Sequence, residues 1–376
     1  MSVISLTWSQ VNAWRVAQHA LAHRLPSQEL VSAARRTVGI QAQVMSAAEL
    51  ALWARLDGLA QQDVQSALWQ ARTLVKTWAM RATLHLLPAA DLPLYVAARS
   101  VYEARNWSNY FDFFGISPAQ SEAFLAAVPQ VLGSQPVTRE QLAAAVADYT
   151  SVPDLEQKLL GSSWGSLWKP SAWRGDLCFG PNQGRSVTFV RPAAWFGGWQ
   201  AVEPYPALQE IARRFLQAYG PARPEGFARW WDGGGILHAR KLFQSIAPEL
   251  EEVEVEGCQA FALRTTLEAM RRSQPAGTVR LLPLFDAYLM GIGRDAEAIL
   301  PQAYQRLVFR PQGWISAVVL ADGVVQGVWE TKPRGGQTLV TVRPFSSLPE
   351  ATRHGIQAEA QRLGAYLNRN VEVEYE

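Results

Sequence analysis

The stretch LQEIARRFLQAYGPARPEGFARWWDGGGILHARKLFQSIAPELEEVEVEGCQAFALR, residues 208–264, decides the fold of this chain. Its first part is amphipathic with helical spacing and ends at Gly220-Pro221, because glycine stops a helix and proline cannot continue it. Pro224 suits the first position of a second helix, and three glycines at 233–235 form a turn before a third. The pattern predicts helices over 208–219, 224–231 and 236–246, then strands over 253–256 and 260–264. Three helices followed by a hairpin are typical of a winged helix-turn-helix.

The third of these predicted helices is basic on one side. Its outer face would carry His238, Arg240 and Lys241, and its inner face Ala239 and Leu242. In a helix-turn-helix protein the corresponding helix enters the major groove, so we expect Arg240 and Lys241 to contact DNA. The alternative is that this third module serves as a scaffold.

Similar orders of elements precede this stretch. Strand-like sequence over 74–87 follows several predicted helices, the first over 6–25, and a second hairpin is expected over 177–190. Two of the helices begin with a capping-box pattern, at Thr7/Gln10 and at Thr138/Gln141. The helix-then-hairpin order therefore occurs three times, although the three units share topology more than sequence.

Strands dominate the C-terminal part. Asp322-Gly323 is a strong signal for a tight hairpin turn, and a last helix over 350–367 precedes a terminal strand. We therefore predict an α+β fold of tandem winged-helix modules, over residues 1–115, 116–200 and 201–275, followed by a β-rich domain over 276–376.

Composition limits the function only weakly. The 376 residues are 48% hydrophobic and 18% charged, which suits several folded modules without long disordered tails. The net charge of +2 is too small to indicate nucleic-acid binding by itself. Only five of the 35 basic residues are lysines, and arginine is the residue that suits phosphates and base edges. A GC-rich genome is the alternative explanation of that bias.

No secretory or membrane segment is expected. The N-terminal residues lack a basic start followed by an apolar run, and no stretch approaches the roughly 18 apolar residues of a membrane span. Cys178 and Cys258 lie far apart, which fits a reducing compartment better than a disulfide scaffold. We expect a cytoplasmic, nucleoid-associated monomer without a membrane partner.

Two motifs that can bind ligands are better explained otherwise. The glycines at 233–235 lack the Lys-Ser/Thr pair that follows in a phosphate-binding loop. His19 and His23 are four residues apart on a predicted helix, a spacing that can bind zinc, but no third ligand is evident. We therefore expect no metal, no nucleotide cofactor and no other cofactor.

The segment Gln41-Ala42-Gln43 is the most informative short motif. It lies in a gap between two predicted helices and precedes the helical run over 46–55. Because a lone Gln-x-Gln is common by chance, its setting carries the information. Together with TWAMRATLH at 77–85, this setting resembles the AlkZ-like winged-helix DNA glycosylases. The resemblance covers nearly the whole chain, extending to FLQAYGPA at 215–222, LPLFDAYL at 282–289 and the hairpin that ends in Gly327-Val328-Trp329.

The resemblance implies a fold, an activity and a site. It implies tandem winged helices plus a C-terminal β-barrel-like domain, and a repair enzyme that removes alkylated bases from double-stranded DNA or unhooks interstrand crosslinks. The family signature is Gln–apolar–Gln or Gln–apolar–Asp, and the chain carries the first form at Gln41 and Gln43. Ala42 is smaller than the usual middle residue, a departure that can alter the shape of the pocket.

Two neutral amides suffice for a labile lesion. An N3- or N7-alkylated purine already carries positive charge and leaves as a neutral base, so little general acid is needed. What remains is to place a water molecule and to stabilise an oxocarbenium-like sugar, which fixed dipoles can do. The interpretation is therefore that Gln41 and Gln43 orient the water. No lysine is marked as a Schiff-base nucleophile, so the enzyme is expected to be monofunctional.

Further candidates are more open. Asp286 is a carboxylate that can assist the water, or can instead orient a turn or pair with an arginine. Arg81 and His85 can contact DNA, or can support the loop that holds Gln41. A winged-helix DNA-binding protein without catalysis, such as a transcription regulator, is the main alternative function. A structural or toxin-resistance protein that binds a DNA-damaging compound is another.

Overall fold

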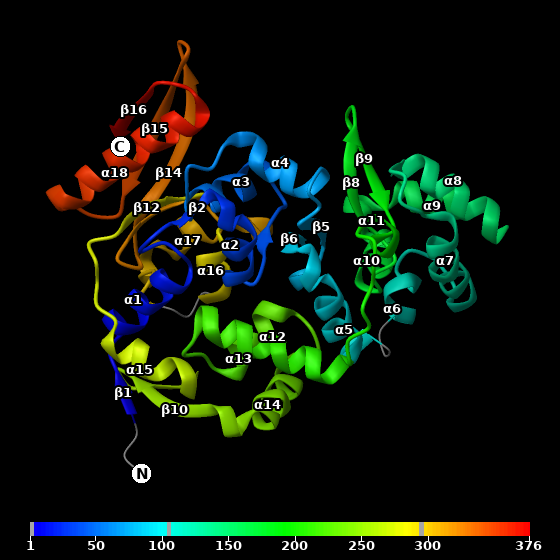
Figure 1. The fold of residues 1–376 in the computed structure, drawn as a ribbon, viewed down its shortest axis with the longest axis horizontal. Coiled ribbons are helices and arrows are strands. Elements are labelled where there is room, and N and C mark those ends of the chain that lie inside the picture. The colour runs from blue at the N-terminus through cyan, green and yellow to red at the C-terminus, as the bar shows by residue number, and fades with distance from the viewer. Residues whose placement is uncertain (1–3, 104–106, 293–296) are drawn as a thin grey trace. The chain divides into compact units, whose positions relative to one another are not determined.

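The computed structural model describes residues 4–103, 107–292 and 297–376, which fall into two compact units (Figure 1). The first unit combines the chain up to Gln65 with Ala212–Trp231 and Gly235–Glu376. The second holds Ser66–Ile211 and Asp232–Gly234. Both units mix helices and strands, so the predicted α+β class is confirmed.

The N-terminal part of the first unit contains short elements around the Gln-x-Gln motif. Thr7 and Gln10 form the predicted capping box at the start of α1. This helix ends at Gln18, earlier than the sequence pattern suggests, because Ala20 turns the backbone to a φ of 54°. The elements are β1 (Ile4–Leu6), α1 (Trp8–Gln18), β2 (Leu25–Pro26), α2 (Leu30–Arg36), β3 (Ile40–Gln41), α3 (Met45–Trp53) and β4 (Leu56–Asp57).

The stretch over 208–264 folds in the predicted order. It comprises α12 (Pro204–Tyr219), α13 (Pro224–Trp231), α14 (Gly235–Ser245), β10 (Leu250–Val255) and β11 (Cys258–Leu263), followed by α15 (Arg264–Arg272). Strand β1 adds to this hairpin, parallel to β10, and Leu6, Val253 and Met270 share the core beneath it. Apolar burial by the distant N-terminal strand therefore completes the module.

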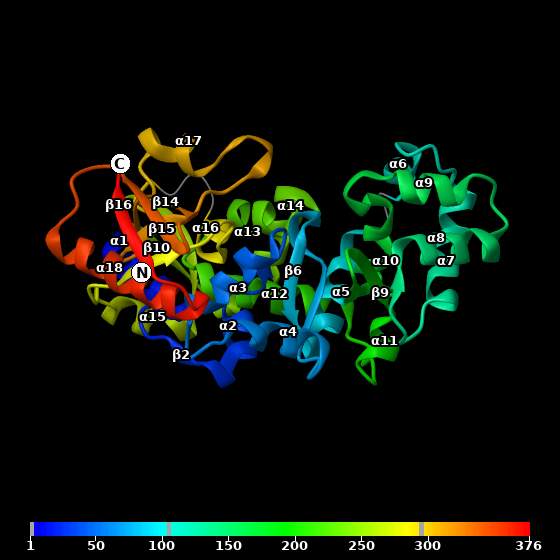
Figure 2. The same cartoon turned by 90° about the horizontal axis from the view of Figure 1, so that it is seen from above.

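The C-terminal strands form a five-stranded sheet in the order β12-β13-β14-β15-β16. Asp322 and Gly323 both adopt positive φ in the β13–β14 turn, as a tight hairpin requires. Among the described residues the edge strands β12 and β16 do not pair, so the sheet is open and the β-barrel-like expectation is not confirmed. Helix α18 (Glu350–Leu367) packs on both edge strands, and it lies beside β16 in Figure 2. The strands are β12 (Val279–Leu282), β13 (Val318–Ala321), β14 (Val324–Arg334), β15 (Gln337–Pro344) and β16 (Val371–Tyr375).

Between β12 and β13 the chain leaves the sheet. It forms α16 (Ala287–Ile292), then a 3-10 turn at Gln302–Tyr304, α17 (Gln305–Val308) and a second 3-10 turn at Pro311–Gly313. This excursion supplies one wall of the groove described below.

The second unit holds two hairpins and most of the remaining helices. Thr138 and Gln141 form the predicted capping box of α8, and the hairpin expected over 177–190 is present as β8 and β9. Its core is aromatic, with Phe124, Trp168 and Phe189 buried together. The elements are β5 (Leu74–Trp78), β6 (Leu84–Pro88), α5 (Leu92–Glu103), α6 (Trp107–Asp112), α7 (Pro118–Val131), β7 (Val137–Thr138), α8 (Arg139–Thr150), α9 (Leu155–Gly161), α10 (Lys169–Trp173), β8 (Cys178–Gln183), β9 (Ser186–Val190) and α11 (Pro192–Trp195), with α4 (Gln61–Trp69) at its N-terminal boundary. In the described part of the chain, every helix is too short or too polar to cross a bilayer.

Candidate active site

The Gln-x-Gln motif occupies the junction between β3 and α3. Gln41 ends the strand and is only 6% exposed, Ala42 is buried, and Gln43 is exposed just before the helix begins at Met45. Upstream, Tyr219 donates a hydrogen bond from its hydroxyl to the Thr37 carbonyl at 2.9 Å. The motif therefore sits on a short, anchored connection, with one amide covered by protein and one amide reaching solvent.

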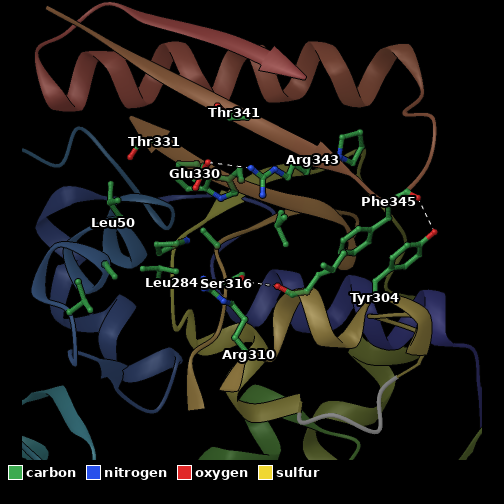
Figure 3. A pocket seen from close by; sticks show the side chains of 18 of the residues that line it. Leu50, Leu284, Tyr304, Arg310, Ser316, Glu330, Thr331, Thr341, Arg343 and Phe345 are labelled. Carbon is green, nitrogen blue, oxygen red and sulfur yellow. Dashed lines mark hydrogen bonds and ion pairs between the residues drawn. The ribbon is translucent and has the colours of Figure 1, made fainter. Parts of the chain in front are cut away.

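A groove of about 730 Å³ begins where this motif ends. Val44, the residue after Gln43, and Leu50 line it from α3, and strands β14 and β15 form the facing wall (Figure 3). The volume is several times that of a single purine. The lining residues are Val44, Ser46, Ala47, Leu50, Pro283, Leu284, Tyr304, Arg306, Leu307, Arg310, Ser316, Ala317, Val328, Trp329, Glu330, Thr331, Thr341, Arg343, Pro344 and Phe345.

Charge in the groove is mostly positive. Its arginines are Arg306, Arg310 and Arg343, and its carboxylate is Glu330. Lys332 Nζ lies 2.6 Å from Glu330 Oε1. Arg343 lies 3.6 Å from the same oxygen, a contact drawn in Figure 3. The Lys332 hydrogen bond, with smaller contributions from the arginines, lowers the pKa of Glu330. Glu330 is held as an anion by its basic neighbours, and the lining still has a net positive charge because its three arginines outnumber this one carboxylate.

An aromatic pair closes one end of the groove. The rings of Tyr304 and Phe345 stack with centroids 4.2 Å apart and planes within 3°. The Tyr304 hydroxyl donates to the Phe345 carbonyl at 2.8 Å, which fixes the pair (Figure 3). A rigid, flat, apolar surface thus lies beside the basic side chains.

Asp286 lies inside the protein. Its two oxygens accept from Arg55 Nη1 and Nη2, each at 2.8 Å, in a fully buried bidentate ion pair. One of these oxygens also accepts from the backbone N–H of Tyr288, which caps the start of α16. Asp286 therefore joins α16 to the residue that follows α3, and in this structure it has no exposed surface from which to reach a water molecule.

Arg55 also ends a buried polar network that includes His19. Arg55 Nη2 lies 3.5 Å from His19 Nδ1, and the imidazole packs edge-on against Tyr219 and Tyr288. Burial, and then the Arg55 charge, lowers the pKa of His19 well below its usual value. His19, considered above as a zinc ligand, is thus a neutral core histidine. The described residues contain no group of three or more side chains that could hold a metal ion.

Arg81 and His85 lie together in the second unit, at the β5–β6 connection. The imidazole Nδ1–H donates to the Thr83 carbonyl at 3.0 Å, which leaves Nε2 to accept from Arg81 Nη2 at 3.3 Å. Burial, with the Arg81 charge, lowers the pKa of His85 to about 3. Arg81 and Ala82 both adopt positive φ, a costly backbone conformation for non-glycine residues. Such strain commonly marks functional loops.

The basic helix α14 is arranged as predicted. Ala239 and Leu242 are buried, and Arg240 and Lys241 are exposed. The guanidinium of Arg240 donates to Glu225 at 2.6 and 3.0 Å, so part of its charge is already neutralised. Lys241 is the more open of the two cations.

The structure therefore places the site residues predicted from the sequence in different environments. Gln43 immediately precedes Val44, the first residue of the groove lining, whereas Asp286 is internal and Arg240 and Lys241 lie on α14. Sequence reasoning missed Arg55, Arg306 and Arg310. The signal for Arg55 was an arginine that ends the otherwise apolar run Ala51–Ala54.

The α+β fold carries a groove whose excess of arginines suits an anionic ligand such as a nucleic acid, and comparison with known proteins makes the class of protein specific. The chain belongs to the AlkZ-like DNA glycosylase family, because the family model described as DNA glycosylase AlkZ-like matches residues 34–366. It is therefore a DNA glycosylase, as the sequence predicts.

A sequence comparison and a structure comparison support this assignment. The chain is 36% identical over 362 residues to the interstrand DNA cross-link repair glycosylase of Streptomyces sahachiroi, an alignment that covers 95% of each chain. Its structure is similar to the solved structure of Streptomyces sahachiroi DNA glycosylase AlkZ, with a TM-score of 0.89 at 34% identity, covering 99% of this chain and 100% of that one.

Proposed function

We propose that this chain hydrolyses the N-glycosidic bond of N3- and N7-alkylated purines in double-stranded DNA, and that it also unhooks interstrand crosslinks attached at those positions. The observation that carries the proposal is the position of Gln43, an exposed amide directly before the helix that lines the basic groove. Crosslinks enter the proposal because the similar Streptomyces enzyme is named for their repair. The groove is also larger than one base requires.

The reaction needs no strong acid from the protein. The bond between C1′ and the purine nitrogen breaks, and its electron pair neutralises the alkylated base as it departs. A water oxygen then bonds to C1′ and its proton passes to solvent. We assign Gln41 and Gln43 to orient this water: each amide oxygen can accept from it, and each amide N–H can donate to the substrate. Because the Gln41 side chain is covered by protein, its amide keeps a fixed orientation and fixes one of the hydrogen bonds to the water.

Asp286 is assigned a positioning role in this scheme. Its bidentate contact with Arg55 ties the end of α3 to α16, and the start of α3 follows Gln43. A rigid α3 keeps the Gln43 backbone in place. A direct role for the carboxylate requires exposure that Asp286 lacks here.

The chain is proposed to consist of three winged-helix modules, over residues 1–115, 116–200 and 201–275, followed by a β-rich domain over 276–376. The winged-helix modules are proposed to contact DNA. The order α12-α13-α14-β10-β11 supports the third module. Arg81 is assigned to the lesion-side strand, with buried His85 supporting it through the contact between Arg81 Nη2 and His85 Nε2, and Arg240 and Lys241 are assigned to backbone phosphates. The enzyme is proposed to act as a monomer without cofactor, in the cytoplasm.

Replacing both glutamines by alanine tests the chemistry. In single-turnover reactions on a duplex with one N7-methylguanine, followed by hot alkali to cleave abasic sites, Q41A/Q43A should be at least about 100-fold slower. Duplex affinity should stay within about twofold, because neither side chain neutralises a phosphate. The matched control is Q361A, an exposed glutamine on α18. Undiminished excision by Q41A/Q43A would show that these residues do not position the water.

A further inference from the structure

The segment 302–316 forms one wall of the groove, and it is held by ring stacking and hydrogen bonds although it lies outside the sheet. Tyr304 is fixed by its stacking on Phe345, and the Ser316 N–H donates to the Val308 carbonyl at 2.9 Å. The Arg310 N–H donates to the Trp314 carbonyl at 2.8 Å, which closes a tight turn. Side chains on this segment are therefore presented in fixed positions.

Two apolar side chains project from this segment into solvent. Leu307 is 53% exposed and Trp314 is 40% exposed, and Trp314 packs its ring against Phe285 at 5.1 Å. Single exposed apolar residues are ordinary on protein surfaces. Here, however, Leu307 lines the groove, directly follows Arg306, and lies on the hydrogen-bonded segment 302–316. An exposed leucine next to arginines suits a ligand that carries both negative charges and flat, stacked rings.

The two arginines of the segment make no close ion pair among the described residues, although the charge of Arg310 contributes to lowering the pKa of Glu330. Arg306 and Arg310 are both exposed, and across residues 4–103, 107–292 and 297–376 neither guanidinium has a carboxylate within ion-pair distance. The carboxylate of the groove, Glu330, is already bound by Lys332 and Arg343. Two arginines thus remain free to bind an external anion with their forked donors.

We propose that segment 302–316 is a strand-holding element: Arg306 and Arg310 bind consecutive phosphodiesters of the lesion-bearing strand, and Leu307 enters the duplex where the damaged nucleotide has left the stack. This inference rests on the proposed function, since a glycosylase must extrude its target base. Extrusion leaves an apolar gap between base pairs, and proteins that kink DNA fill such gaps with leucine, isoleucine or phenylalanine. The phosphates flanking that gap lie where neighbouring cations can reach them.

DNA is favoured over a protein partner by charge and by position. The anions of a duplex recur along each strand, so one strand can offer a phosphate to each of the two arginines, and the segment borders the groove that is also lined by Val44, the residue after Gln43. A second copy of this chain would bring the same two cations and repel them.

Salt-dependent binding tests the arginines without using the chemistry. A duplex with a tetrahydrofuran abasic analogue cannot be hydrolysed, and its affinity is read by fluorescence anisotropy between about 50 and 200 mM KCl. R306Q/R310Q should lower the slope of log affinity against log salt by about 1.8, because each phosphate contact contributes about 0.9. Over that range the wild type should lose about tenfold more affinity than the variant. R271Q, on the exposed face of α15, should keep the full slope.

Insertion of Leu307 into the duplex is tested with the fluorescent base 2-aminopurine, placed next to the abasic analogue. The fluorescence of 2-aminopurine rises when this base unstacks from its neighbours. L307A should abolish most of the rise at saturating protein, whereas L237A, at a leucine that is 71% exposed on α14, should not. An unchanged slope for R306Q/R310Q, or a full fluorescence rise for L307A, overturns the proposal. If sedimentation shows that L307A changes the oligomeric state while DNA binding stays intact, the proposal is also overturned. Leu307 would then contact a second copy of the chain and not DNA.

Failure of this proposal is distinct from failure of the proposed chemistry. If Q41A/Q43A still excises N7-methylguanine while R306Q/R310Q shows the lowered salt slope, the strand-holding assignment stands and the assignment of the glutamines falls. If Q41A/Q43A is inactive and R306Q/R310Q binds like the wild type, the reverse holds.

Discussion

Replacing Asp286 by alanine leaves the guanidinium of Arg55 buried without its counter-ion. Both side chains are fully buried, and two hydrogen bonds of 2.8 Å join them. The substitution also removes the acceptor for the Tyr288 N–H at the start of α16. Arg55 keeps a hydrogen bond from Nη1 to the Ala51 carbonyl at 2.7 Å, which does not neutralise its charge.

The cost is expected to be large. Removing one partner of a buried ion pair destabilises a protein by about 3–5 kcal/mol, since the remaining charge is uncompensated. Loss of the helix cap adds about 1 kcal/mol. For a unit of this size each kcal/mol lowers the melting temperature by roughly 2–4 °C, so D286A should melt at least roughly 6 °C below the wild type.

Calorimetry and urea unfolding measure this effect. D57A is the matched control, because the Asp57 carboxylate is 66% exposed and its contacts with Arg24 and Arg362 are 4.0 and 3.7 Å long. That variant should lose no more than about 1 kcal/mol. The double variant R55M/D286L removes both charges and should recover most of the stability lost by D286A. A loss of less than about 1 kcal/mol for D286A would refute the reasoning.

The same position separates the two roles considered for Asp286. D286N keeps the shape and one acceptor oxygen. If Asp286 acts through Arg55, excision of N7-methylguanine by folded D286N, measured below its melting temperature, should stay within about tenfold of the wild type. If the carboxylate itself activates water, the rate should fall by about 100-fold or more in a protein that remains stable.

Two further predictions concern buried titratable groups. The pKa of His85 is lowered to about 3 by burial and by Arg81, so between pH 3 and about 6.5 the unfolded chain binds a proton that the folded chain does not. The His85 contribution to the free energy of unfolding is therefore complete above about pH 6.5 and falls by up to about 1.4 kcal/mol per pH unit below it. H85Q should flatten that dependence in urea titrations at several pH values, and an imidazole that titrates near 6.5 by NMR would contradict the assignment. Burial also raises the pKa of the Cys178 thiol, whereas Cys258 is exposed. A thiol reagent should therefore modify only Cys258 in the native enzyme and both residues in denaturant, and fast native modification of Cys178, checked with C258S, would count against this placement.

Local signals in the sequence determined much of the secondary structure. The capping boxes at Thr7/Gln10 and Thr138/Gln141 begin helices, and Asp322-Gly323 makes the predicted turn. Each of these depends on neighbours within a few residues, so the chain needs no tertiary context to specify it. The error at α1, which stops at Gln18, shows the limit: apolar spacing continues to Leu25, but packing turns the backbone at Ala20.

The candidate site was predicted only in part. Gln41 and Gln43 were identifiable because a short motif stood within a recognisable setting, and the family assignment followed from it. Periodicity carried no information about which distant side chains would face that motif. Arg55 and Asp286 are 231 residues apart, and β1 pairs with β10 across an even longer separation.

Sequence by itself determined the kinds of elements, their order and the enzyme family, because those depend on local chemistry and on matching motifs. Only the tertiary structure decided that Asp286 is internal, that α18 packs across both edges of an open sheet, and that Arg306 and Arg310 face the same groove as Val44. The physical reason is that burial and charge pairing are settled between segments far apart in the chain, after the local elements have formed.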